Sequence, residues 1–350
     1  MKAVFSANQL AHAPTWFLSK GEMVDYPESP DRARALMEGV RMAGANIFGN
    51  RKFAPTMYRR VHAQGYVDFL TQGFAAWKEV EGAGPELMPS LRPTILPLLK
   101  NESVLAQAGQ YMMDFSCAIM EHTWKSVEAS ALTAVTAADM VLKGDAMVYA
   151  LCRPPGHHAY GNRAGGFCYL NNTALAAQHL RGVHRKVAIL DIDVHHGNGT
   201  QSIFYRRADV LTVSIHADPQ NFYPFYWGGA DEVGEAEGKD FNVNLPLAVG
   251  AGDDAWLSAL ETALEKIRNY EPSALVLALG LDAHEADPLK GGTVTTAGFA
   301  SIAQAIAALQ LPTVIVQEGG YLTAHLSNNL STFLRAFKAA HRLEAKGGSA

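Results

Sequence analysis

The stretch KVAILDIDVHHGNGTQ, residues 186–201, changes from apolar to polar near its middle. Its first part is a short apolar run, which predicts a strand that is buried on both faces. Two aspartates and two histidines then fall within the six positions 191–196. Asp191, Asp193 and His195 alternate, so their side chains share one side of the chain while it stays extended. The stretch therefore predicts a group of metal-seeking side chains at the end of a buried strand.

Short apolar runs alternate with amphipathic segments on both sides of this stretch. The apolar runs predict buried strands at 146–152, 186–192, 209–215, 273–280 and 312–318. Amphipathic segments with helical periodicity lie at 170–182, 253–270, 295–310 and 325–343. This alternation is typical of an α/β protein in which helices cover both faces of one parallel sheet.

Length and composition bound the domain organisation. The chain has 350 residues, 48% of them hydrophobic, which is enough for one large core. No internal repeat or linker divides it, so we expect a single domain over residues 1–350. Residues 82–102 contain four prolines and fit neither a helix nor a strand. A segment of this kind predicts a long ordered loop or an insertion.

Charge and cysteine content limit the partners and the compartment. The net charge is −5 and no Lys/Arg block occurs, so we expect no nucleic-acid partner. The three cysteines have no CxxC spacing, which argues against a disulfide framework or a thiolate zinc site and favours a reducing compartment. No secretory pattern or bilayer-length apolar stretch is present, so we expect a soluble, cytoplasmic protein without membrane contact.

Polar side chains gather directly after four of the apolar runs. In open α/β sheets the active site lies outside the carboxyl ends of the strands, so these side chains are expected at one rim. They are His157, His158, Asp191, Asp193, His195, His196, Asp282, His284, Glu285 and Tyr321. One histidine at such a place is usually structural, but the convergence of so many groups favours a functional site.

Three of these side chains suit one divalent cation. Asp193 and His195 come from the same strand end, and Asp282 joins them from another run. Two carboxylates and one imidazole leave a coordination position open for water, which is the pattern of a catalytic rather than a structural zinc ion. Fe(II) or Co(II) would also fit this oxygen-rich set. The sequence therefore predicts one catalytic metal ion per chain.

Five motifs, in this order, resemble those of a known family. They are RPPGHHA, GGFCYLNN, DIDVHHGNGTQ, LGLDAHEADP and EGGY, which lie between about residues 150 and 322. The chain is similar to the zinc-dependent deacetylase family, which contains histone deacetylases and acetylpolyamine amidohydrolases. Weaker similarity, in YPESPDRA and VHAQGYVDFL, reaches back toward the N-terminus. The resemblance implies the arginase-deacetylase fold, a single parallel sheet flanked by helices.

The resemblance also implies roles for the residues of the rim. The zinc ligands are Asp193, His195 and Asp282. His158 exchanges the proton of the attacking water, while His157, with Asp191 behind it, acts through its charge. Tyr321 helps to hold the substrate carbonyl. Many relatives have an aspartate where this chain has Asn198, and a neutral amide orients the ring of His158 without raising its pKa as a carboxylate would.

A monovalent cation and an acyl tunnel are implied as well. A K⁺ or Na⁺ ion is expected at Asp191, Asp193, His195, Ser214 and Ile215. The walls of the narrow acyl tunnel are expected to include Gly166, Phe167 and Tyr226.

Two other classes of function remain as alternatives. Arginase-like ureohydrolases need a D-x-D-x-x-D-P segment to bridge two manganese ions, and here the segment reads DAHEADP, with His284 in place of the second carboxylate. A non-catalytic acyl-binding module that kept its zinc site would have lost a chemical residue, whereas His157, His158 and Tyr321 are all present. Both are less favoured than a zinc-dependent amidohydrolase.

The identity of the leaving amine is the most open part of the prediction. Residues from about Gly82 to Trp124 resemble an insertion of bacterial acetylpolyamine amidohydrolases, where it helps to form a dimer that narrows the entrance. This favours a small acetylated polyamine and a homodimer or higher homo-oligomer, with protein acetyl-lysine or another small amide as the alternative. Candidates for contact with a charged amine are Asp114, Glu121, Glu285 and the aromatic stretch 221–227. His284 and Glu285 could instead line the mouth or simply be exposed.

Overall fold

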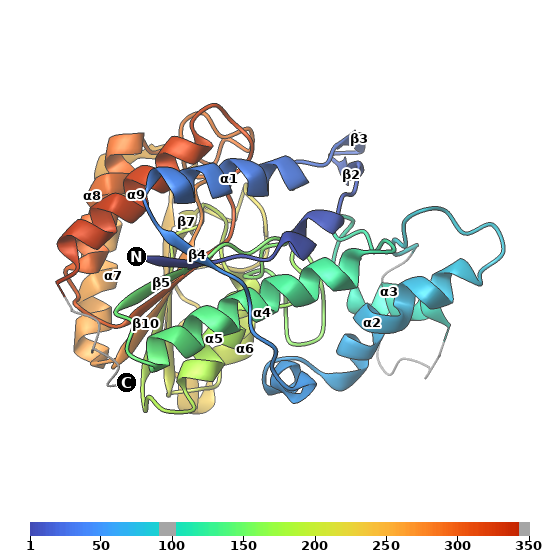
Figure 1. Ribbon diagram of the computed structural model, residues 1–350, viewed down its shortest axis with the longest axis horizontal. Coiled ribbons are helices and arrows are strands. Elements are labelled where there is room, and N and C mark those ends of the chain that lie inside the picture. Colours follow the sequence, from blue (N-terminus) through green and yellow to red (C-terminus); the bar gives the residue numbers. More distant parts are fainter. Residues whose placement is uncertain (91–102, 343–350) are drawn as a thin grey trace.

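The computed structural model describes residues 1–90 and 103–342, and its centre is a parallel β-sheet (Figure 1). In these residues the sheet has eight strands in the order β4-β1-β5-β12-β10-β6-β7-β8. Their bounds are β4 (Asn46–Phe48), β1 (Lys2–Val4), β5 (Met147–Ala150), β12 (Thr313–Gln317), β10 (Ala274–Leu279), β6 (Val187–Asp191), β7 (Val210–Ala217) and β8 (Asn242–Leu247). Every neighbouring pair is parallel, which confirms the predicted α/β fold with a single parallel sheet.

The five apolar runs correspond to the five central strands β5, β6, β7, β10 and β12. β1, β4 and β8 are not predicted by any apolar run. β4 is an edge strand of three exposed residues, so no apolar run marks it. β8 forms the other edge and contains Pro246, a residue that sheets tolerate mainly at their edges.

Helices cover both faces of the sheet (Figure 1), and two apolar clusters are buried between the helices and the sheet. One face carries α1 (Pro30–Met42), α7 (Asp253–Tyr270), α8 (Thr296–Ala307) and α9 (Leu326–Ala340). The other carries α4 (Thr123–Leu142), α5 (Asn172–Leu180) and α6 (Asn198–Phe204). In β6, Leu190 faces the first cluster and Ile189 the second. Burial on both faces explains the unbroken apolar runs of the central strands.

The predicted helices are confirmed as α5, α7, α8 and α9. Local signals set their starts: the side chain of Asn171 accepts a hydrogen bond from the N–H of Ala174, and Thr295 accepts one from Gly298. In the described part of the chain, none of the helices combines the length and the apolar character that crossing a membrane requires.

The segment predicted as an insertion contributes residues to a third apolar cluster. It contains α3 (Val104–Tyr111), which packs with α2 (Gln64–Lys78) in that cluster. Leu87 and Ile119 exchange backbone hydrogen bonds, so the two ends of the segment are joined. The ordered loop predicted over 82–102 falls in part on residues 91–102, which lie outside the described residues.

Two small sheets flank the main one. β2 (Trp16–Ser19) and β3 (Glu22–Asp25) form an antiparallel hairpin, and β9 (Ala251–Gly252) pairs with β11 (Gly292–Thr293). Phe17 of the hairpin packs against a cluster that contains Phe167 and Tyr321. The hairpin therefore borders the region where the predicted rim residues lie.

The strand order brings the four rim motifs together. β5, β12, β10 and β6 are consecutive in the sheet, and one motif follows each of them. Asp191 at the end of β6 is in register with Ala278 of β10 and Ser214 of β7. Because parallel strands end at the same edge, the loops that follow them meet there.

Candidate active site

The three predicted metal ligands meet at the carboxyl ends of β6 and β10. Nδ1 of His195 lies 3.1 Å from Oδ1 of Asp193 and 3.0 Å from Oδ2 of Asp282. Within the residues that the structure describes, this is the one group of three or more His, Cys, Asp or Glu side chains whose ligand atoms all lie within 4.8 Å of one another. The arrangement can hold one ion through two oxygens and one nitrogen.

The charge of the group also suits a cation. Asp193 and Asp282 are completely buried. Burial raises the pKa of Asp282, and the neighbouring Asp193 carboxylate raises it further. Burial also opposes the ionisation of Asp193, but the adjacent His157 and His195 outweigh it and lower its pKa. Two adjacent carboxylates in a buried site need positive charge beside them, which a divalent ion supplies.

Backbone groups hold the two carboxylates in place. Oδ2 of Asp193 accepts a hydrogen bond from Gly319 N–H at 2.6 Å, and Oδ1 of Asp282 accepts one from Val194 N–H at 3.0 Å. A Cβ atom on Gly319 would lie 2.1 Å from Oδ2 of Asp282 and 2.4 Å from Oδ2 of Asp193. The first glycine of the EGGY motif is therefore required by the close approach of the two ligand carboxylates.

The tandem histidines have different partners and opposite pKa shifts. Nδ1 of His157 lies 2.9 Å from Oδ2 of Asp191, and Nδ1 of His158 lies 2.7 Å from Oδ1 of Asn198. Burial lowers the pKa of His157, but the carboxylates of Asp193 and Asp191 outweigh it and raise the pKa to about 10. Burial and the neighbouring His157 and His195 lower the pKa of His158. One ring is therefore charged and the other neutral.

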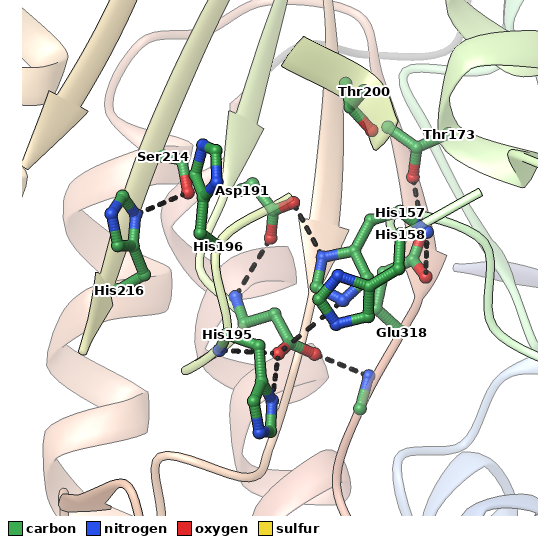
Figure 2. A network of polar contacts seen from close by, with 12 residues as sticks. His157, His158, Thr173, Asp191, His195, His196, Thr200, Ser214, His216 and Glu318 are labelled. Atoms are coloured by element: carbon green, nitrogen blue, oxygen red, sulfur yellow. Dashed lines mark hydrogen bonds and ion pairs between the residues drawn. The ribbon is translucent and has the colours of Figure 1, made fainter. Parts of the chain in front are cut away.

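Glu318 fixes the loop that carries the two histidines (Figure 2). Its Oε2 accepts hydrogen bonds from the N–H groups of Gly156 and His157, and its Oε1 accepts one from the Thr173 hydroxyl. Burial raises the pKa of Glu318 to about 7. Glu318 is not among the predicted site residues, although its place directly after β12 and before two glycines is a signal for a role.

Tyr321 follows the same two glycines and is 4% exposed. Its backbone N–H donates to Oδ2 of Asp287 at 2.9 Å. The guanidinium group of Arg32 lies 5.5 Å from the centre of its ring and donates to the backbone carbonyls of Glu318 and Gly320. Burial and the nearby Asp282 raise the pKa of the Tyr321 hydroxyl, so it stays protonated and can donate a hydrogen bond.

A pocket of about 630 Å³ leads to this group of residues. His158, His195 and Tyr321 all line it, so the tandem-histidine loop, a metal ligand and the tyrosine face the same space. Gly166 and Phe167 line it as predicted. A Cβ on Gly166 would lie 2.3 Å from the ring of His158, so the wall can approach the histidine only at a glycine.

Tyr226 is among the residues that line the pocket, as predicted, but Tyr223 and not Tyr226 lies beside His158. Tyr226 is 81% exposed and lies at the mouth. Tyr223 takes the inner position: its ring lies 4.9 Å from that of His158, and its hydroxyl donates to Oδ2 of Asp114 at 2.7 Å. Phe222 stacks on His195 with 4.9 Å between ring centres. The stretch 221–227 is aromatic throughout, so its composition does not show which rings face inward.

The charged residues considered for amine contact separate into one that lines the pocket and two that do not. Asp114 lines it, and its oxygens accept hydrogen bonds from Tyr223, Gly166 and Ser116. Glu121 and Glu285 are exposed and lie outside the lining.

The sequence predicts that His284 lines the mouth of the pocket or is exposed to solvent, and both predictions are wrong. It is 3% exposed, because it lies over the ring of Phe299 and beside that of His325. Asp287, the last acid of the DAHEADP segment, accepts hydrogen bonds from Tyr321 and Leu289. This arrangement leaves the ligands for one metal ion and does not supply the second set that a ureohydrolase needs.

Of the residues expected to bind a monovalent cation, Figure 2 labels Asp191, His195 and Ser214. Asp191 and Ser214 occupy paired positions on β6 and β7, and Ile215 follows Ser214. Oδ1 of Asp191 accepts the backbone N–H of Asp193 at 3.0 Å. His196 has other partners: its Nε2 lies 3.0 Å from Oε1 of Gln201, and its ring centre lies 4.6 Å from that of His216.

The fold and the site define a class of protein. A parallel α/β sheet with a two-aspartate, one-histidine group and tandem histidines at its carboxyl edge is the arrangement of a metal-dependent deacetylase. The family model for the histone deacetylase domain matches residues 26–337. The chain therefore belongs to the histone deacetylase family and is an enzyme of the deacetylase, amide-hydrolysing type.

Individual relatives give a narrower comparison. The chain is 44% identical to an acetylpolyamine amidohydrolase of Burkholderia pseudomallei, over 97% of this chain and 99% of that protein. It is 38% identical to acetylpolyamine amidohydrolase 1 of Pseudomonas aeruginosa, over 98% and 100%. The crystal structure of the acetylpolyamine aminohydrolase from Burkholderia pseudomallei superposes with a TM-score of 0.94, and the HDA15 HD domain, 28% identical, with 0.77.

Proposed function

We propose that this chain removes the acetyl group from small acetylated amines, and that acetylated polyamines are its main substrates. The observation that carries the proposal is the convergence of one metal-ligand group with His158 and Tyr321 at the inner end of one pocket. In the reaction, water adds to the amide carbonyl carbon and the C–N bond breaks, which yields acetate and the free amine. The relatives named acetylpolyamine amidohydrolases support the choice of amine.

Asp193, His195 and Asp282 would hold one divalent ion, for which Zn²⁺ is the first choice and Fe(II) or Co(II) also fits. When bound, the ion would supply Lewis acidity, which polarises the amide carbonyl and makes water a nucleophile at neutral pH. Elemental analysis of the purified protein should find about one such ion per chain. Two manganese ions required for turnover would instead support the ureohydrolase alternative.

His158 carries the proton in this mechanism. Its Nδ1 donates to the Asn198 carbonyl, so its Nε2 has a free lone pair, and the lowered pKa keeps the ring neutral. The ring accepts a proton from the attacking water and returns it to the leaving nitrogen. His157, held by Asp191, remains charged and stabilises the negative charge that develops beside it.

Tyr321 donates a hydrogen bond to the carbonyl oxygen as negative charge develops there. Its hydroxyl is protonated at neutral pH and its ring lines the pocket. A donor that is already oriented stabilises the tetrahedral state without reorganisation, which is the action of an oxyanion hole. The chain thus supplies a proton carrier and an oxyanion donor from two different strand ends.

The walls of the pocket favour a slender substrate with an apolar stem. Phe167, Phe222 and Tyr223 line it near His158 and His195, while Asp114 adds one carboxylate. Aromatic walls can contact the methylene groups of a polyamine and its cationic nitrogens. Comparison of kcat/KM for acetylputrescine, acetylspermidine, an acetyl-lysine peptide and neutral acetanilide tests this. Preference for the peptide or for acetanilide would overturn the polyamine assignment and leave the amidohydrolase assignment intact.

A structural K⁺ or Na⁺ ion and self-association complete the proposal. Asp191, Asp193, His195, Ser214 and Ile215 would hold the monovalent ion through oxygen atoms. Dialysis into a buffer that replaces K⁺ and Na⁺ with a large organic cation should empty this site and lower the melting temperature. Residues 82–124 would form part of a homodimer contact. Sedimentation equilibrium measures whether the chain forms a dimer. The three free, buried cysteines suit the reducing cytoplasm, where we expect the enzyme to work.

A further inference from the structure

Asp287 is a buried carboxylate with no part in the proposed chemistry. It is 3% exposed and lies in the loop that follows Asp282. Its Oδ2 accepts the backbone N–H of Tyr321 and its Oδ1 accepts that of Leu289, each at 2.9 Å. Both oxygens are therefore used by backbone donors, one on the loop after β12 and the other on its own loop.

The turn that carries Asp287 is itself fixed. Asp287 N–H donates to the carbonyl of His284 at 2.9 Å, and the Asp287 carbonyl accepts from Lys290 N–H at 3.1 Å. These two bonds hold both sides of the residue, so its carboxylate starts from a defined place. The side chain then reaches across to the loop after β12.

The loop after β12 needs such a contact. Gly319 and Gly320 precede Tyr321, and Gly320 has φ of +108°, a conformation that other residues rarely adopt. Two glycines give the chain more freedom than other residues would, and they have no side chain that could fix Tyr321. The Tyr321 N–H is anchored by Asp287, and the Gly320 carbonyl by Arg32. The position of the tyrosine ring thus depends on partners outside its own loop.

We infer that Asp287 is a positioning residue that places the Tyr321 hydroxyl against the reacting carbonyl. Through its hydrogen bond with Leu289, the same carboxylate also fixes part of the pocket wall relative to Tyr321. The inference rests on the proposed function, because that function assigns the oxyanion donor to Tyr321. Leu289 lines the pocket, so one carboxylate couples an inner residue with a wall residue. A carboxylate can accept both N–H groups, whereas an asparagine amide has only one accepting oxygen.

A double-mutant cycle tests this role. Asp287→Asn should lower kcat by about 10- to 100-fold, the range expected when a catalytic group is displaced by about 1 Å. In a Tyr321→Phe background the same substitution should cost at most about twofold more, since groups that act as one unit are not additive. Metal content should not change in any of the three variants. Equal fold-losses in both backgrounds would show a role independent of the hydroxyl and would overturn the inference.

Two further variants separate positioning from charge and from stability. Asp287→Glu keeps the charge but lengthens the side chain, so it should also lose kcat; full activity would overturn the inference, and this variant replaces Asp287→Asn if the latter does not fold. Asp253→Asn is the matched control, because Asp253 accepts two hydrogen bonds from Thr295 away from the pocket. It should lower Tm without changing kcat. Absence of turnover of every acetyl amide by the wild-type enzyme would overturn the proposed function itself.

Discussion

The inner end of the pocket and its mouth are built in opposite ways. At the inner end, Asp193, His158 and Tyr321 are buried; Asp193 accepts a hydrogen bond from Gly319, His158 donates one to Asn198, and Tyr321 donates one to Asp287. At the mouth, Phe225 and Tyr226 are 55% and 81% exposed. Asp193, His158 and Tyr321 follow strands of the central sheet, whereas Phe225 and Tyr226 lie in the stretch 221–227, outside any strand.

This difference shows where chemistry and selectivity reside in the molecule. Reacting groups need positions fixed to a fraction of an ångström, and strand ends with backbone hydrogen bonds supply them. Selection among amines needs only a fitting surface, which an aromatic loop provides and can change without disturbing the sheet. Substitutions at the inner end should therefore act on kcat and metal content, and substitutions at the mouth on kcat/KM for particular amines.

The largest effect is expected from removal of a metal ligand. Asp282→Ala should abolish both metal binding and turnover, because it removes one of three ligands and leaves Asp193 without its neighbour at the ion. Elemental analysis and a turnover assay measure the two effects. Asp209→Ala, which removes a carboxylate paired with Arg181 and Arg207, is the control and should keep both. Full metal content in Asp282→Ala would contradict the ligand assignment.

Loss of the proton carrier should have the next largest effect. His158→Ala should lower kcat by about 10²–10⁴-fold with metal content unchanged, because general acid–base transfer contributes on that scale. His341→Ala is a matched control, since His341 is a buried histidine that stacks on Phe337 and is not among the residues that line the pocket. It should affect stability alone. If His158→Ala turned over substrate like the wild type, the proton would have to be carried by another group.

A smaller loss at the inner end is expected from the oxyanion donor. Tyr321→Phe removes one hydroxyl and should lower kcat by about 10²–10³-fold while KM and metal content stay near those of the wild type. Tyr270→Phe removes a buried hydroxyl that donates to the Ala208 carbonyl, and it should leave kcat unchanged. A Tyr321→Phe enzyme that changes only in KM would place the hydroxyl in ground-state binding instead.

The smallest effect is expected at the mouth. Tyr226→Ala should lower kcat/KM for acetylspermidine by about two- to fivefold, from the ~0.5–1 kcal/mol of an exposed contact between a cation and an aromatic ring. With neutral acetanilide the decrease in kcat/KM should be smaller. The kcat of Tyr226→Ala should equal that of the wild type with both substrates. Phe48→Ala, an exposed aromatic on the edge strand β4, is the control. A loss of kcat as large as that of Tyr321→Phe would break the division between mouth and inner end.

The central sheet and the ligand group could be predicted because their signals are local. Apolar runs mark strands that are buried on both faces, and polar residues that follow such runs share one edge of a parallel sheet. Asp193, His195 and Asp282 meet for this reason alone. The edge strands β4 and β8 carry weaker signals, since all residues of β4 are exposed and the two buried residues of β8, Asn242 and Asn244, are polar.

The contacts of the supporting residues could not be predicted, because their partners are distant in sequence. Glu318 binds the loop of His157, 161 positions away, and Asp114 accepts from Tyr223, 109 positions away. Asp287 precedes a proline and has the pattern of an ordinary turn, yet its carboxylate holds Tyr321. Such contacts depend on loop conformations that no periodicity encodes. The same holds for the stretch 221–227, because only the course of this loop turns Tyr223 inward and leaves Tyr226 exposed at the mouth.

The central place of β6 in the sheet has a consequence for how the molecule opens. β6 is paired on both sides, with β10 and β7, and helices pack over both of its faces. Its amide protons should exchange with deuterium only when the whole sheet unfolds, whereas those of residues 221–227 should exchange through local opening. The loop at the entrance can thus open many times, and let acetate and amine leave, before the sheet that holds the metal ligands unfolds once.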